Sequence, residues 1–192
     1  SREVNERGIA PTIFSVLREQ RPKAEIGCLY EWPGIKYLVD TLAMSYQYQT
    51  PGYAKAPTAL CEAAEKYIIE KKPELLAICF EEPDHTGHTK GHDTPAYYQM
   101  LKELDGYVER ILQAIKKAGI WVACADMGGD DYFDASLDGA IAIVIGSEGD
   151  GVSRLVKEKC DFVVSMPMYG KISSLNASVA AGLLMYEVVR QR

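Results

Sequence analysis

The sequence is poor in the residues that form disulfide frameworks or metal sites. Only three of its 192 residues are histidine, and the number of cysteines is odd. The cysteines share no close spacing and stand at Cys28, Cys61, Cys79, Cys124 and Cys160. Such scattered cysteines do not indicate a disulfide framework, so the sequence predicts a reduced, intracellular protein, and we expect it in the cytoplasm.

Long apolar runs and a positive charge excess are also missing. No apolar run reaches the roughly 20 residues of a membrane span, and no signal peptide is visible, so we expect no membrane partner. The formal net charge of -6 excludes a positive field over the whole surface, although local basic patches leave RNA open as a partner. With 47% hydrophobic residues, the chain has enough apolar material for a sizeable core, in one domain or two joined halves.

Helical and strand-like segments alternate along the chain, and no repeat is visible. Helices are predicted over residues 11–21, 35–44, 58–72, 94–118, 153–159 and 174–191. Strands are predicted over residues 24–32, 75–80, 120–125, 140–145 and 162–165. Loops are predicted over residues 45–57, 84–93 and 126–138. This alternation predicts an α/β fold with a mainly parallel sheet of about five strands flanked by helices.

One polar segment, Asp84 to Asp93, contains all three histidines and directly follows an apolar strand that ends at Phe80. Imidazoles and carboxylates at the carboxyl end of a parallel strand suit zinc or another divalent ion. A polar loop in which one histidine caps the next helix is the alternative, and the sequence leaves both open. A complete metal site needs more ligands than this segment supplies.

A second polar segment follows the strand in Ile141 to Gly151, read IAIVIGSEGDG. The missing side chain of Gly146 would let a ligand approach the backbone, and Glu148 follows on the turn. Gly149 and Gly151 allow left-handed conformations. An ordinary strand-to-helix turn is the alternative for this segment taken alone.

A third segment, Val164 to Ala180, reads VSMPMYGKISSLNASVA and leads into the last helix at Ser173 or Ser174. Exposed N–H groups at a helix start, together with Ser and Asn side chains, can hold polar ligand groups. A capped helix with a tight interface is the alternative. Two strand ends that both open into small-residue loops suit a nucleotide-like ligand against the backbone.

Two stretches of the first part, ICFEEPDHTGHTKG and YYQMLKELDGYVERILQAIKKAGI, carry a family resemblance. Through them, residues from about 7 to 120 resemble an internal segment of the nucleotide pyrophosphatase/phosphodiesterases of the alkaline phosphatase superfamily. The resemblance implies that Asp84 and His88 bind one of two zinc ions of a metal-dependent hydrolase.

The same stretch departs from that family at several functional positions. The strand with a metal-binding aspartate and the threonine or serine nucleophile have no counterpart in the sequence. In place of the family's S-D-H-G motif stands Ala125-Asp126-Met127-Gly128, without the histidine, and a later zinc-binding histidine is absent. The resemblance therefore implies an incomplete hydrolase site.

The last part of the chain, IVIGSEGDGVSRLVKEKCDFVVSMPMYGKISSLNASVAAGLLMYEVVRQR, carries a second resemblance. Residues from about 121 to 192 resemble the C-terminal half of SpoU/TrmH-type RNA 2'-O-ribose methyltransferases of the SPOUT class. The resemblance implies a trefoil knot that binds S-adenosylmethionine, a structured RNA as methyl acceptor and a homodimer formed through the C-terminal helix. The family's first motif, which carries a catalytic arginine, is absent from this sequence.

Site residues follow from this second resemblance by position. The implied cofactor contacts are Gly146, Gly149, Met166, Met168 and Leu175. The implied polar positions near methyl transfer are Glu148, Ser174 and Asn176.

The two resemblances meet near residues 119–125, where both families have a helix-to-strand step. The sequence thus predicts a chimaera of two α/β segments, 1–120 and 121–192, or one merged α/β domain. We expect an S-adenosylmethionine-binding, methyltransferase-like protein, and the missing arginine motif argues against catalysis. A phosphodiesterase-like hydrolase with an incomplete site and an inactive chimaeric scaffold are the alternatives.

Overall fold

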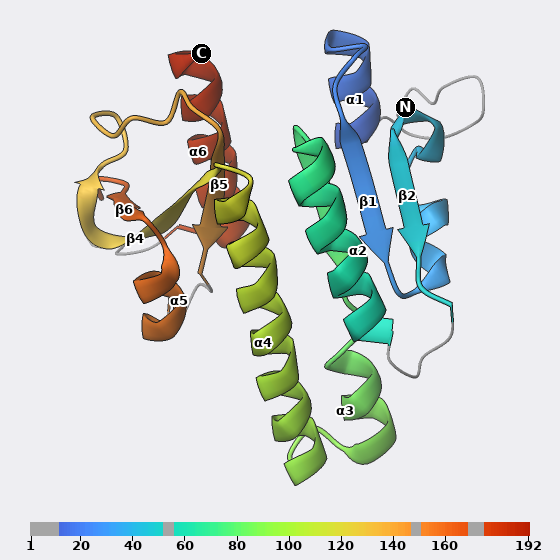
Figure 1. Cartoon of the computed structure of the whole chain (residues 1–192). Coiled ribbons are helices and arrows are strands. Elements are labelled where there is room, and N and C mark those ends of the chain that lie inside the picture. The colour runs from blue at the N-terminus through green and yellow to red at the C-terminus, as the bar shows by residue number, and fades with distance from the viewer. Residues whose placement is uncertain (1–11, 52–55, 147–150, 169–174) are drawn as a thin grey trace, which may run out of the picture. The chain divides into compact units, whose positions relative to one another are not determined.

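The computed structural model describes residues 12–51, 56–146, 151–168 and 175–192. The chain forms two compact units, Ser1–Ala114 and Ile115–Arg192. Each unit contains a parallel sheet with helices beside it (Figure 1). The predicted α/β class with parallel strands is confirmed.

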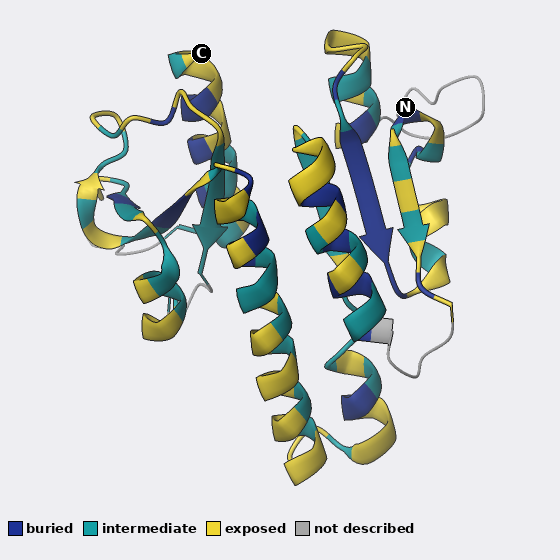
Figure 2. Ribbon diagram, viewed as in Figure 1, coloured by how far each residue is buried: buried dark blue, intermediate teal, exposed yellow. Residues whose placement is uncertain are grey.

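The first unit is built around sheet A, whose strand order is β2-β1-β3. Its elements are α1 (Ile13–Gln20), β1 (Ile26–Tyr30), the 3-10 helices η1 (Pro33–Tyr37) and η2 (Thr41–Ala43), β2 (Tyr46–Gln49), α2 (Ala56–Lys71), β3 (Leu75–Cys79), α3 (Asp84–Lys90) and most of α4 (Pro95–Lys117). Every residue of the central strand β1 is buried, as its dark ribbon shows (Figure 2). One cluster of apolar side chains around Phe14 and Ile26 and a second around Leu29, Leu60 and Tyr67 form the core of this unit.

Strand β2 lies inside the segment predicted as the loop 45–57, so that prediction is wrong there. Its residues alternate between half-buried Tyr46 and Tyr48 and exposed Gln47 and Gln49. Both tyrosines pack against the core beside Leu29, and the Tyr46 ring stacks on Tyr67 with centroids 4.6 Å apart. A half-buried strand needs only one apolar face, and aromatic residues supply it here.

Two other predictions in this unit also need correction. The predicted helix 35–44 is instead the pair η1 and η2, because the Asp40 side chain accepts a hydrogen bond from Leu42 N (3.2 Å) and starts a new turn. The predicted loop 84–93 contains helix α3. A Glu82 carboxylate oxygen accepts a hydrogen bond from Thr86 N (3.0 Å), and Gly91, with φ of 93°, ends the helix.

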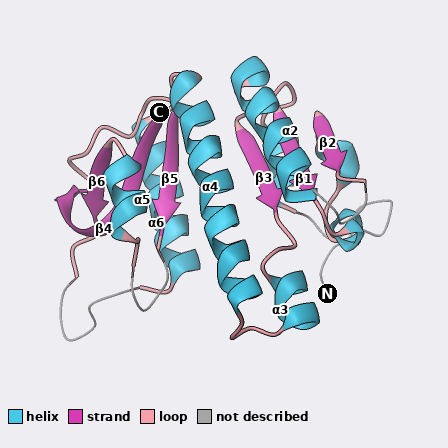
Figure 3. Cartoon of the chain, turned by 60° about the horizontal axis from the view of Figure 1, so that its bottom comes forward, coloured by secondary structure: helices cyan, strands magenta, loops and turns pink. Residues whose placement is uncertain are grey.

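The second unit is built around sheet B, whose strand order is β5-β4-β6 (Figure 3). Its elements are the end of α4, β4 (Trp121–Asp131), β5 (Ile141–Ile145), α5 (Arg154–Lys159), β6 (Phe162–Ser165) and α6 (Ala177–Gln191). The predicted single sheet of about five strands is therefore corrected, since the described residues form two sheets of three strands each. The buried core of this unit contains Leu137, Val164, Leu184 and Val188.

Strand β4 is longer than the predicted 120–125 because it continues beyond an irregularity. Its pairing with β6 shifts from Ala125 to Asp130, both of which are register partners of Val164. Gly128 has φ of 81°, and a Cβ at Gly129 would lie 2.3 Å from the Val163 carbonyl oxygen. Glycines at these two positions permit the bulge, so part of the predicted loop 126–138 is strand.

Helix α6 begins later than predicted. Residues 169–174, which include the predicted start at Ser173 or Ser174 and much of the segment that would form a knot, lie outside the described residues. Within the described part the helix starts at Ala177, and Asn176 is its N-cap. The Asn176 side chain accepts hydrogen bonds from Ser178 N (3.0 Å) and Val179 N (3.4 Å), which fixes the first turn.

All five cysteines are free. In the part of the chain that the structure describes, no helix has the length and hydropathy required to cross a membrane.

Candidate functional site

Two of the predicted site residues lie at the carboxyl edge of sheet B. Strands β5 and β6 both pair in parallel with β4, so their ends at Ile145 and Ser165 open toward the same edge. Gly146 directly follows β5, and Met166 directly follows β6. Loops at the carboxyl edge of a parallel sheet are the usual place for a ligand in an α/β fold.

The structure describes some of the predicted cofactor and transfer residues and not others. Gly146, Met166 and Leu175 are half-buried, and Met168 is exposed. Glu148, Gly149 and Ser174 lie outside the described residues. Asn176 uses its side-chain oxygen as the cap of α6.

Gly146 is required by the protein's own backbone. A Cβ at this position would lie 2.1 Å from the carbonyl carbon of Gly151 and 2.4 Å from Val152 N. Such distances are far inside van der Waals contact. The space that we expected to admit a ligand is therefore filled by the returning loop, and the glycine allows this loop to close against the end of β5.

Two residues that the sequence analysis did not assign to a site, Asp126 and Lys157, lie at this same edge. Lys157 Nζ is 3.0 Å from Asp126 Oδ2, and Met127 N donates to Asp126 Oδ1 at 2.7 Å. A Cβ on Gly151 would lie 3.5 Å from Asp126 Oδ1, so the returning loop also reaches this carboxylate. The hydrogen bond from Lys157 is the main reason that the pKa of Asp126 is lowered. The sequence clue was an aspartate directly after the apolar part of a strand.

Removing the Asp126–Lys157 pair should change the pH dependence of stability. Because the pKa of Asp126 is lowered by folding, the pair stabilises the protein above the ordinary aspartate pKa of about 3.9 and loses this effect as the pH falls further. The side chains are 24% and 35% exposed, so we expect Asp126→Asn to cost about 0.2–1 kcal/mol at pH 7 and less at pH 3. Urea unfolding at both pH values measures this difference.

The control for that measurement is Glu158→Gln, which removes the more exposed Arg154–Glu158 pair in the same unit. We expect that substitution to have less effect than Asp126→Asn at pH 7. Equal losses for Asp126→Asn at pH 7 and pH 3 would contradict the assigned role of Lys157.

The predicted metal ligands Asp84 and His88 lie together on helix α3. His88 Nε2 is 3.5 Å from Asp84 Oδ1, and both side chains are more than 70% exposed. The His88 ring is also 5.8 Å from that of His92 between centroids. Among the described residues no group of three His, Cys, Asp or Glu side chains is arranged to hold a metal ion. One carboxylate and one imidazole do not complete the three or four protein ligands that zinc takes, so these two residues alone do not fit a zinc site.

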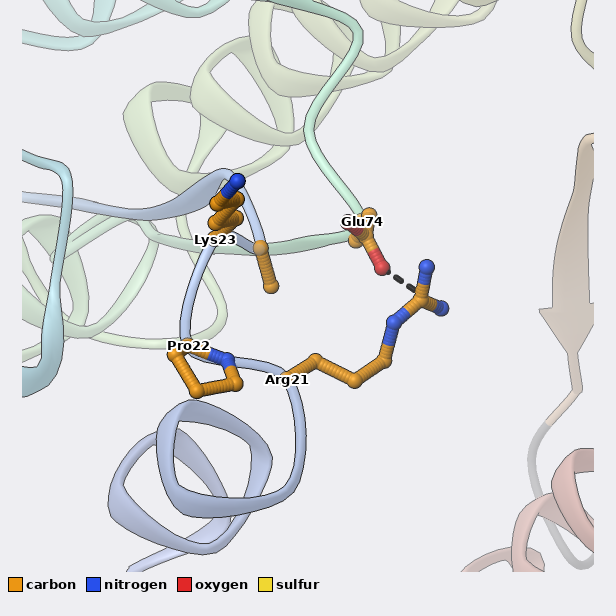
Figure 4. A pocket seen from close by; sticks show the side chains of 5 residues that line it. Arg21, Pro22, Lys23 and Glu74 are labelled. Atoms are coloured by element: carbon orange, nitrogen blue, oxygen red, sulfur yellow. Dashed lines mark ion pairs between the residues drawn. The ribbon is translucent and has the colours of Figure 1, made fainter.

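A surface hollow of about 350 Å³ lies elsewhere in the first unit. It is lined by Arg21, Pro22, Lys23, Ala24 and Glu74 (Figure 4). These residues precede β1 and β3, so the hollow lies at the amino edge of sheet A, and an Arg21–Glu74 ion pair of 2.7 Å crosses it. None of the predicted site residues lines it.

Two family models match this sequence. Residues 11–128, more than half of the chain, match the type I phosphodiesterase / nucleotide pyrophosphatase family. Residues 96–186 match the SpoU rRNA methylase family. The two matches overlap over residues 96–128, a range that includes α4 and the boundary between the two units.

Curated proteins match the chain over part of its length. The chain is 58% identical over 85 residues to the putative TrmH family tRNA/rRNA methyltransferase YacO of Bacillus subtilis (strain 168). The aligned region covers 43% of this chain and 34% of that protein. The chain thus spans about a third of the length of the curated relatives it matches.

The solved structures that align with the chain include members of both groups, all with TM-scores below 0.5. The SpoU methyltransferase AviRb of Streptomyces viridochromogenes, crystallised with AdoMet, is 25% identical, with a TM-score of 0.42 over 88% of this chain and 61% of that one. Murine ectonucleotide pyrophosphatase / phosphodiesterase 5 is 24% identical, with a TM-score of 0.41 over 57% of this chain and 29% of that one.

Residues 96–186 therefore carry the match to the SpoU rRNA methylase family, and through residues 11–128 the chain belongs to the type I phosphodiesterase / nucleotide pyrophosphatase family.

Proposed function

We propose that the second unit binds S-adenosylmethionine at the carboxyl edge of sheet B, as a SpoU/TrmH RNA 2'-O-ribose methyltransferase-like unit. The observation that supports this most is the parallel pairing of β5 and β6 with β4, which brings Gly146 and Met166 to one edge of the sheet. The 58% identity to a putative TrmH family methyltransferase over 85 residues supports the same assignment.

The proposed cofactor contacts are Gly146, Gly149, Met166, Met168 and Leu175. Among the described members, Met166, Met168 and Leu175 suit an adenosyl ligand, because their apolar side chains remain partly accessible. Bound S-adenosylmethionine supplies an electrophilic methyl group. Glu148, Ser174 and Asn176 are proposed to face the methyl acceptor, a ribose 2'-hydroxyl of a structured RNA. Methyl transfer itself is not assigned to this chain, because the family's arginine-bearing motif has no counterpart in the sequence.

Titration calorimetry with S-adenosylmethionine tests the binding proposal. We expect the wild-type chain to bind, and Met168→Glu to bind at least about tenfold more weakly, because a carboxylate replaces an exposed apolar contact. Leu42→Glu, which also replaces an exposed apolar side chain by an acidic one but in the first unit, serves as the control. This variant should bind S-adenosylmethionine with normal affinity. Absence of heat with the wild-type chain, or equal affinity in Met168→Glu, would end the proposal.

We also propose that a second copy of the chain packs on helix α6. One side of α6 is buried against sheet B through Ala180, Leu184 and Val188. Other parts of the helix are exposed, as the yellow stretches of its ribbon show (Figure 2). Its exposed large side chains are Val179, Leu183, Met185, Tyr186 and Val189, of which Tyr186 is 79% exposed. An apolar face of this kind is typical of a protein interface.

The dimer proposal predicts that Tyr186→Lys weakens self-association. A lysine at the centre of an apolar interface must be desolvated, and we expect the dimer dissociation constant to rise at least about tenfold. Light scattering across a concentration series measures it, with Leu42→Lys as the control that leaves association unchanged. A wild-type chain that is monomeric at all concentrations would contradict the proposal.

A second candidate function is metal-dependent phosphodiester hydrolysis by the first unit. The family match over residues 11–128 and the contact between Asp84 and His88 favour it. Metal analysis and hydrolysis of a nitrophenyl phosphodiester test it, with Asp84→Asn as the variant that should lose both zinc and turnover. Absence of zinc and turnover in the wild-type chain would remove this candidate. If S-adenosylmethionine binding is absent as well, the chain is an inactive scaffold that joins segments of two families.

A further inference from the structure

Two buried oxygen atoms at the carboxyl edge of sheet A have no hydrogen-bond partner. They are Glu31 Oε1 and Thr50 Oγ1, and they are the only such side-chain atoms among the described residues. The two residues are 5% and 3% exposed. Leaving a polar atom buried and unpaired costs free energy, so each case calls for a partner that completes its bonding.

These two residues lie side by side. Glu31 directly follows β1 and Thr50 directly follows β2, in a register where Tyr30 pairs with Gln49. The hydrogen bond from Thr50 N to Tyr30 O (3.2 Å) belongs to that pair and holds Thr50 beside the end of β1. Glu31 and Thr50 therefore stand at equivalent positions, one residue beyond the last pair of β1 and β2, at the same edge of the sheet.

The surroundings of Glu31 are negative. Its other oxygen, Oε2, accepts a hydrogen bond from Glu81 N at 2.6 Å, at the carboxyl end of the neighbouring strand β3. No ion pair joins Glu31 to a basic side chain in the described part of the protein, and the carboxylates of Glu81 and Glu82, which follow β3 in the chain, act on it. Burial is the main reason that the pKa of Glu31 is raised.

From this arrangement we infer that Glu31 and Thr50 form part of a site for a small hard metal cation at the carboxyl edge of sheet A. Carboxylate and hydroxyl oxygens are the ligands such cations prefer. A cation would satisfy both unpaired oxygens and also neutralise the buried carboxylate, whereas a water molecule would do only the first. The site is separate from the contact between Asp84 and His88, whose side chains are largely exposed on α3.

Thermal unfolding of the full chain tests the site. The chlorides of Na⁺, K⁺, Mg²⁺ and Ca²⁺ are compared with choline chloride at the same ionic strength, because choline is a bulky organic cation that does not coordinate oxygen ligands as a metal ion does. We expect one of the four cations to raise the unfolding midpoint of the wild-type chain by about 3 °C or more at saturation. Glu31→Gln keeps an acceptor for Glu81 N, so it should fold, but it should lose this shift.

Two further variants sharpen the outcome. Thr50→Val removes only the hydroxyl and should weaken the apparent cation affinity about tenfold or more, whereas Asp84→Asn should keep the full shift. No shift above choline in the wild-type chain, or an equal shift in Glu31→Gln, would mean that the two oxygens hold water only and would overturn the inference. Loss of the shift in Asp84→Asn would overturn it as well, by placing the cation on α3.

Discussion

Gly146→Val is expected to weaken S-adenosylmethionine binding about ten- to a hundredfold and to destabilise the second unit by about 1–3 kcal/mol. Any Cβ at this position meets the backbone of Gly151 and Val152, so the returning loop must move away from the end of β5. Glu148 and Gly149 stand in the sequence between Gly146 and Gly151, so we expect this movement to weaken the proposed site. Calorimetry measures the affinity, and hydrogen exchange in β5 and β4 measures the local stability.

The matched control for this prediction is Gly139→Ala in the same unit. A Cβ on Gly139 would have no heavy atom within 4 Å, and its φ is not in the left-handed region. We expect normal affinity and normal protection from exchange. Retention of full binding by Gly146→Val would show that the loop after β5 does not have to close against the strand for the cofactor to bind.

Leu184→Ala is expected to destabilise the second unit by about 2–5 kcal/mol. Leu184 is fully buried on α6 and packs in the cluster that contains Leu137, Val164 and Val188. Truncation leaves a cavity between the helix and sheet B, and the surrounding side chains refill it only partly. Hydrogen exchange in the peptides of β4 and β5 follows the stability of this unit separately from that of the first.

Its neighbour on the same helix provides the control. Leu183 is 41% exposed, so Leu183→Ala removes much less buried surface and should cost about 0.5 kcal/mol or less in the monomer. The comparison is made at low protein concentration, where self-association through the exposed face of α6 does not contribute. An equal loss of stability in Leu184→Ala and Leu183→Ala would contradict the assignment of Leu184 to the buried face of α6 and Leu183 to its exposed face.

Local patterns predicted the regular elements well where one periodicity dominated. The strand 162–165 occurs as predicted, because FVVS is a short apolar run between polar residues. The long helix was predicted from Thr94 to Ala118, and the Thr94 hydroxyl accepts a hydrogen bond from Tyr97 N while Gly119 has φ of 78°. Strand β2 was missed because its buried face is two tyrosines separated by glutamine.

Residues that meet only through the fold were harder to predict. Asp126 and Lys157 are 31 positions apart, and the bulge in β4 and the returning loop bring them together. Glu31 and Thr50 stand at the same edge of sheet A only because β1 and β2 are adjacent, which required β2 to be known. In both cases the sequence around one residue does not indicate which distant residue will lie near it.

By itself, the sequence determined the α/β class, the alternation of its elements and the two family segments, because these depend on periodicity, caps and contiguous motifs. Only the tertiary structure decided that the strands divide into two three-stranded sheets and that backbone fills the space beside Gly146. It also decided that Asp84 and His88 lie together without a third ligand among the described residues. These outcomes depend on strand pairing and close packing between distant segments, which no local pattern encodes.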